Sequence, residues 1–449
     1  MCFIRIPICV FLILALLSAE TPKLPEPYQS IAELARGAPV EFAADALLRL
    51  VESGKIGNQD AKGELVSEAF RLAAAAKFKV RMRKLPGSIP DTRSSALSNA
   101  YDLKLDVLSL QSRAVADMVP IDKAKARELF REIVRPSLPA LTCDDPLVYD
   151  VADFYQTLGI VANATFTAEE RAKEEHLNFL LDYLAQAATP AALAPLARVI
   201  QSAAVTPDQS AILWNRFNGL LETMQPDDRS FSAAAPEIAK GVNAGTQESF
   251  LKFLQRSKGC PDDGSPGVSL DLSRGPVQAG NTPHVESYWQ SAEAKRLLED
   301  GQRLRIRPDG KLVSEAERST REWQQQLTDY LAAMAAWTSA QEKSEADYYH
   351  QKCVVYEALV ELIPPGPQRD KTLEAYVNFV SNSNLQSNSP AEWFMHAHSM
   401  LDRVRSTSSG EPAKMLAAFE TSGNRSLALY AALEKAFGGG LPAWVTKSN

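Results

Sequence analysis

The stretch "TPAALAPLARVIQSAAVTPDQSAILWNRFNGLLET", Thr189 to Thr223, decides the fold. Threonine precedes proline at both Thr189 and Thr206, and an apolar-rich run follows each pair. A threonine hydroxyl can cap the free N–H groups of a helix start, and proline at the first helical position lacks an N–H that would be unpaired anyway. The sequence therefore predicts helices over 190–204 and 207–224, joined by a short loop as an antiparallel hairpin.

The same start signals recur along the chain. Asp145, Thr282 and Ser389 also precede proline, and capping boxes are expected at Thr167 with Glu170, Thr206 with Gln209, Ser314 with Glu317 and Ser389 with Glu392. Starts at 145, 167, 189 and 206 are 22, 22 and 17 residues apart. This spacing predicts an all-α protein whose antiparallel helical hairpins stack as an α-solenoid-like array of the TPR or HEAT kind. Neither repeat signature is present, so a non-repetitive helical domain is the alternative.

Composition agrees with a folded helical protein. The chain has 449 residues, 45% hydrophobic content, 23% charged residues and only 22 glycines. Its formal net charge of −7 argues against a nucleic-acid binder, because phosphate contacts need clustered Lys and Arg.

The N-terminus, "MCFIRIPICVFLILALLSAETPK", has the layout of a secretory signal peptide over residues 1–19. Arg5 precedes an apolar run, and small residues lead to predicted cleavage between Ala19 and Glu20. We therefore expect an exported protein, periplasmic or extracellular and bacterial, with no stable membrane insertion after cleavage. An uncleaved signal anchor is the alternative.

Three regions follow the signal. Residues 24–257 are predicted to form an N-terminal helical array and residues 284–441 a C-terminal helical region. Between them, residues 258–283 are rich in Gly and Pro and lack helical periodicity. We interpret this segment as a linker, with a functional loop closing over a small ligand as the alternative.

A small β-hairpin is predicted near 303–313, because apolar residues alternate with three arginines before the turn signal Pro-Asp-Gly. Arg303, Arg305 and Arg307 would then share one face. That face is a candidate anion-binding site, or simply a solvated edge.

Three cysteines lie beyond the signal peptide. Cys143 and Cys260 lie in polar, proline-containing loops, and we expect them to pair as a disulfide after export. Cys353 falls on the apolar face of a predicted helix and is expected in the core. Three unrelated thiols are the alternative.

The segment "LTCDDPLVYDVADFY", Leu141 to Tyr155, is dense in aspartate. A helix over 145–162 would place Asp150 and Asp153 on its polar face, one turn apart. Two such carboxylates could act as an acid/base pair or bind a hard cation, and they could equally be solvated residues.

Histidine offers the second set of candidate metal ligands. Asp347 and His350 have the i, i+3 spacing of helical ligands. His396 and His398 would lie about 200° apart on a helix and cannot share an ion, and His398 is expected to pair with Asp402 instead.

The alternative interpretation of His350 is structural. On the same predicted helix it falls on a polar face with Glu357 and Glu361, and such a face is usually solvated.

No nucleophile motif or phosphate-binding loop occurs in the sequence, so we assign no catalytic residue and no cofactor. The leading hypothesis is an exported helical-repeat protein that serves as a protein–protein interaction or scaffold module, with another protein as partner. The alternative is a helical enzyme, or a metal- or small-ligand-binding protein, with a site assembled from several helices. Its candidate residues are Asp150, Asp153, Asp347, His350, His396 and His398.

Overall fold

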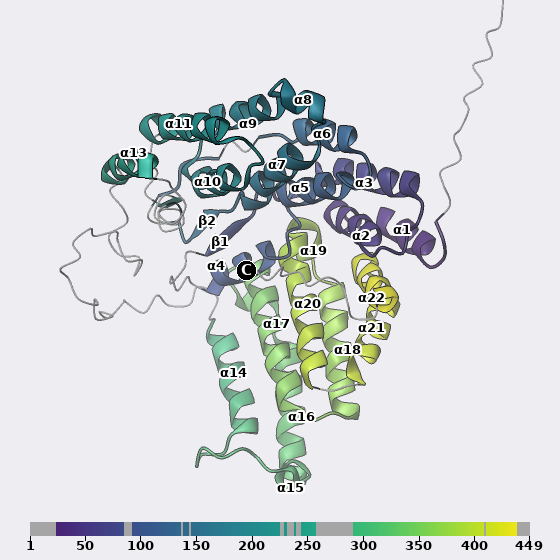
Figure 1. The fold of residues 1–449 in the computed structure, drawn as a ribbon. Coiled ribbons are helices and arrows are strands. Elements are labelled where there is room, and N and C mark those ends of the chain that lie inside the picture. The colour runs from purple at the N-terminus through teal and green to yellow at the C-terminus, as the bar shows by residue number, and fades with distance from the viewer. Residues whose placement is uncertain are drawn as a thin grey trace, which may run out of the picture.

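The computed structural model describes residues 24–84, 92–135, 138–142, 145–224, 229–230, 238, 244–256, 291–407 and 410–437. The signal segment, Cys143, Cys260 and the 258–283 segment lie outside these residues, so the predictions made for them are not tested. The described residues are mostly helical and include one two-stranded sheet (Figure 1). The all-α class is confirmed.

The N-terminal helices pack largely in chain order across the upper part of Figure 1. Helix α2 contacts α1 and α3, α3 contacts α5, α5 contacts α6 and α7, α7 contacts α9 and α10, and α11 contacts α9, α10 and α13. The elements are α1 (Tyr28–Arg36), α2 (Val40–Glu52), α3 (Gln59–Ala73), β1 (Met82–Lys84), α4 (Thr92–Tyr101), α5 (Val107–Met118), α6 (Lys123–Glu132), β2 (Leu147–Tyr149), α7 (Ala152–Ala164), α8 (Ala168–Ala172), α9 (Glu175–Ala185), the 3₁₀ turn η1 (Pro190–Ala192), α10 (Leu193–Ser202), α11 (Pro207–Thr223) and α13 (Ala244–Arg256).

The hairpin predicted from the two Thr-Pro pairs is present. Thr189 caps η1, which leads directly into α10, and Thr206 caps α11 through a complete capping box with Gln209. Helices α10 and α11 contact each other, with Leu213 and Phe217 fully buried. Local capping chemistry therefore sets these two helix starts correctly.

The helix predicted over 145–162 begins later than expected. Asp145 does not cap it, because its carboxylate accepts hydrogen bonds from the N–H (2.7 Å) and hydroxyl (3.1 Å) of Thr142. Residues 147–149 instead form β2, antiparallel to β1 with Val148 opposite Arg83, and α7 starts at Ala152. Here the pairing of β1 with β2 satisfies the backbone N–H and C=O groups. A local capping signal cannot reveal a pairing between segments that are distant in sequence.

The C-terminal helices occupy the lower part of Figure 1. Helix α17 contacts α14, α18 and α20, while α21 contacts α18, α20 and α22. The elements are α14 (Ala292–Arg305), α15 (Glu315–Arg318), α16 (Arg321–Ala336), the 3₁₀ turn η2 (Ser339–Gln341), α17 (Glu345–Leu362), α18 (Pro367–Ser381), α19 (Leu385–Asn388), α20 (Pro390–Thr407), α21 (Glu411–Thr421) and α22 (Arg425–Phe437).

The hairpin predicted near 303–313 is reduced to one bridge, between Ile306 and Leu312. Gly310 occupies the turn with a φ of +78°, as the Pro-Asp-Gly signal requires. Helix α14 continues through Arg305, so Arg303 and Arg305 are helical and do not alternate along a strand.

Aromatic contacts join the two halves. Phe42 on α2 packs against Trp393 and Phe394 on α20, with ring centroids 6.1 and 5.1 Å apart, and Tyr28 stacks on Phe437 at 6.4 Å. Buried apolar residues from both halves belong to one hydrophobic cluster.

These contacts make the two halves unfold together. Phe42→Ala removes a nearly buried ring, 6% exposed, at the junction, so we expect the free energy of unfolding to fall by about 3–5 kcal/mol. Urea denaturation monitored by tryptophan fluorescence measures this change. The control Val134→Ala, at a side chain 84% exposed, should shift it by less than about 0.5 kcal/mol. Equal shifts for the two variants would contradict the packing described.

Candidate functional site

Asp150 and Asp153 are held by cations of the protein itself. Arg81 lies 2.7 Å from the Asp150 carboxylate and 3.5 Å from that of Asp153, and the Lys104 ammonium lies 3.0 Å from Asp153. Asp150 precedes α7 and also accepts a hydrogen bond from the backbone N–H of Ala152. A metal ion here would have to displace Arg81, so the structure favours an ion-paired cluster that anchors the start of α7.

Asp347 and His350 lie on α17 as predicted, but both are 1% exposed. The Asp347 carboxylate accepts a hydrogen bond from the Ser344 hydroxyl (2.8 Å) at the helix start. The Nδ1 of His350 lies 2.9 Å from Nε2 of His396 on α20. The prediction of a solvated face for His350 is therefore wrong, because α20 covers that face.

The histidine pair begins a polar chain between α17 and α20. His396 Nδ1 lies 3.2 Å from the Glu357 carboxylate, and Arg403 joins Glu357 (3.3 Å) to Glu361. If His396 donates its Nδ1–H to Glu357, its Nε2 accepts the Nδ1–H of His350. Both nitrogens of His396 then have a hydrogen-bond partner, and the chain couples the two helices.

This geometry does not form a metal centre. Within the described residues, no group of three or more His, Cys, Asp and Glu side chains is arranged to hold a metal ion. His398 lies apart from the pair, and its Nδ1 is 3.3 Å from the Asp402 carboxylate, as the i, i+4 spacing predicts. The six candidate residues are thus spread over four places: Asp150 with Asp153, Asp347 at the start of α17, His350 with His396, and His398 beside Asp402.

Burial lowers the pKa of His350 well below its ordinary value of 6.5, and the neighbouring His396 and Arg93 lower it further. As the pH falls through 6.5, His350 takes up a proton in the unfolded chain but not in the folded one. The free energy of unfolding must therefore decrease as the pH falls, until the folded-state pKa is reached.

The variant His350→Gln removes this proton uptake. Below about pH 6 the wild-type protein should lose up to about 1.4 kcal/mol more per pH unit than the variant. Urea denaturation at a series of pH values measures both slopes. Buried carboxyl groups with a raised pKa stabilise the folded state as the pH falls. They are present in both proteins, so their contribution cancels when the two slopes are compared. Parallel slopes would show that His350 is not buried as a neutral group.

Cys353 and Lys352 are adjacent on α17, and both side chains are buried. Cys353 is fully buried and desolvation raises the pKa of its thiol well above the ordinary value, which confirms a core residue. The Lys352 ammonium donates to the Trp337 carbonyl (2.9 Å) and the Tyr348 hydroxyl (2.8 Å), and burial lowers its pKa to about 8. Helical periodicity does not reveal the environment of this lysine, because Trp337 lies at the end of a different helix, α16.

The three arginines predicted as an anion site each have an acidic neighbour. Separate ion pairs link Arg303 to Asp300 (3.0 Å), Arg305 to Glu361 (3.8 Å) and Arg307 to Glu317 (3.1 Å). An added anion would compete with these carboxylates, so the structure does not favour a binding site here.

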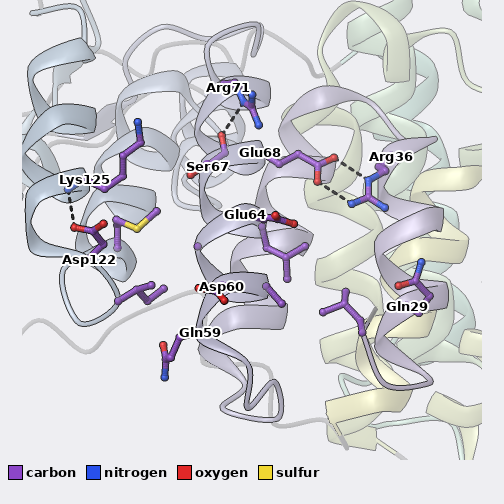
Figure 2. A pocket seen from close by; sticks show the side chains of 16 residues that line it. Gln29, Arg36, Gln59, Asp60, Glu64, Ser67, Glu68, Arg71, Asp122 and Lys125 are labelled. Atoms are coloured by element: carbon purple, nitrogen blue, oxygen red, sulfur yellow. Dashed lines mark hydrogen bonds and ion pairs between the residues drawn. The ribbon is translucent and has the colours of Figure 1, made fainter. Parts of the chain in front are cut away.

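A surface groove of about 910 Å³ runs along α3, between α1 and the start of α6 (Figure 2). We call it the α3 groove. Arg36 of α1 forms two 2.8 Å bonds to Glu68 of α3 on one wall, and Asp122 and Lys125 stand on the other. The remaining lining residues are Leu24, Gln29, Gln59, Asp60, Ala61, Gly63, Glu64, Leu65, Ser67, Arg71, Met118 and Ile121.

Charge in the α3 groove is only partly neutralised. Asp60 and Glu64 project from the exposed face of α3, and neither carboxylate has a cationic partner among the described residues. Within the part of the chain that the structure describes, Arg71 donates to the Ser67 carbonyl of its own helix (3.2 Å) and forms no ion pair. The groove therefore exposes charges that are available to another molecule.

Comparisons with known proteins add no identification. No protein-family model matches the chain, and no curated protein or solved structure is detectably similar to it. Among the described helices, none combines the length and the apolar character needed to cross a membrane.

Proposed function

We propose that this chain is an exported scaffold that binds another protein through its N-terminal helices, packed as an α-solenoid-like array. The observation that carries the proposal is the α3 groove, an open surface hollow bounded by α1, α3 and the start of α6. Arrays of stacked helices present extended surfaces of this kind to protein partners.

The chemistry of the groove supports a protein partner over a small substrate. Small-molecule sites are mostly apolar concavities with a few convergent polar groups. The α3 groove instead carries side chains of both signs along its walls, including Arg71 and the carboxylates of Asp60 and Glu64, which have no cationic partner among the described residues. Complementary surface charge of this type selects and orients a macromolecular partner.

Site-specific cross-linking tests the proposal. A photoreactive amino acid replacing Glu64 should yield a discrete heavier adduct in the exporting cell, because that position faces the open groove. The matched control replaces Glu374, an exposed glutamate on α18 outside the groove, and should give no such adduct. Gel electrophoresis and mass spectrometry measure the products.

A second variant tests whether adduct formation depends on the charges of the α3 groove. Asp60→Arg reverses one unpaired charge beside the probe and should reduce adduct yield several-fold. Absence of any adduct at position 64, or equal adducts at positions 64 and 374, would contradict the proposed function.

A further inference from the structure

Three arginines of α6 and the residues just after it stack on aromatic rings. Arg127 and Arg131 are one turn apart on α6, and Arg135 follows the end of the helix, where Ile133 has extended backbone. The contacts are Arg127 over Phe166 at 4.6 Å, Arg131 over Phe179 at 5.9 Å and Arg135 over Tyr183 at 4.4 Å. All three rings are at least 90% buried, so they form a fixed wall under the guanidinium groups.

The arginines differ in their acidic partners. Arg127 is paired with Glu170 at 2.8 Å. Within the part of the chain that the structure describes, neither Arg131 nor Arg135 has a carboxylate within ion-pair distance. Stacking covers the flat face of a guanidinium but leaves its N–H edge able to donate. Two oriented cations are therefore available for a ligand.

A hollow of about 500 Å³ lies between these arginines and α9. We call it the arginine hollow. Its lining consists of Arg131, Arg135, Phe166, Glu175, Asn178, Phe179, Asp182 and Tyr183. Arginine, tyrosine and phenylalanine are the residues enriched at the centres of protein interfaces.

The two walls of the arginine hollow have opposite charge. Arg131 and Arg135 present guanidinium groups, whereas Glu175 and Asp182 present exposed carboxylates from α9. A simple inorganic anion would be attracted by one wall and repelled by the other. A peptide satisfies both, since its side-chain carboxylate accepts from the arginines and its backbone N–H groups donate to the acidic wall.

We propose that the arginine hollow binds a glutamate- or aspartate-bearing peptide segment of a partner protein. This inference rests on the proposed function in that the partner is a protein, but it concerns a separate surface from the α3 groove. The carboxylate binds the edges of Arg131 and Arg135, and the peptide backbone lies along Asn178 and Asp182.

Fluorescence anisotropy with short labelled peptides tests this directly. A peptide alternating glutamate and glycine should bind the mature protein saturably, and the matched glutamine–glycine peptide should bind at least about tenfold more weakly. The double variant R131Q/R135Q should lower the affinity for the glutamate peptide by at least about tenfold. R131K/R135K should give an intermediate loss, because charge is kept while the planar, stacked donor is lost.

The control variant R303Q/R305Q makes the same change in net charge at arginines that already have acidic partners. It should leave glutamate-peptide affinity unchanged. Asp182→Asn removes the carboxylate charge to which the peptide backbone N–H groups donate, and it should lower that affinity. A circular dichroism melt establishes whether each variant folds. If R131Q/R135Q does not fold, R131K/R135K provides the test.

No saturable binding of the glutamate peptide, equal binding of the glutamine peptide, or an equal effect of R303Q/R305Q would overturn the inference. The probe at position 64 separates this failure from failure of the proposed function. An adduct at position 64 without peptide binding would refute only the proposal that the arginine hollow binds a peptide. Peptide binding without an adduct would refute only the proposal that the α3 groove binds a partner protein.

Discussion

The burial of α2 is the constraint on which the rest of the structure depends. Residues 41–51 of this helix are all buried, because α1, α3 and α5 cover one side and α20 and α22 approach the other. Its two central charges, Asp45 and Arg49, are 2.7 Å apart, and Arg113 of α5 lies 2.7 Å from Asp45. Asp45 keeps a lowered pKa although desolvation opposes this, since both arginines stabilise its charge. Removing one partner of such a network leaves an uncompensated buried charge, which is costly.

This arrangement gives the two halves different roles. The C-terminal helices pack on α1, α2 and α4 and support them from one side, so the α3 groove and the arginine hollow lie on the N-terminal half. Inside the protein, the chain from His350 to Glu361 links ionisable groups of α17 and α20 to one another. Among the described residues, Asp60 and Glu64 in the groove and Arg131 and Arg135 in the hollow have no oppositely charged partner.

Local sequence signals predicted much of the fold and little of the candidate sites. The capping boxes at Thr167, Thr206 and Ser314 are all present, because each depends on residues three apart. Strand β2 was missed because its partner strand lies on a distant segment. The His350–His396 contact spans 46 residues, and helical periodicity on one helix cannot show which face another helix covers. The arginine spacing at 127, 131 and 135 was visible, but the aromatic wall beneath it depends on tertiary packing.

Hydrogen–deuterium exchange on the protein, alone and with its cross-linked partner, tests most directly whether the N-terminal helices carry the binding surface. The account predicts that partner-dependent protection maps to α3, the α6 segment through Arg135, and α9. Protection confined to α14–α18, with these N-terminal segments unchanged, would contradict it.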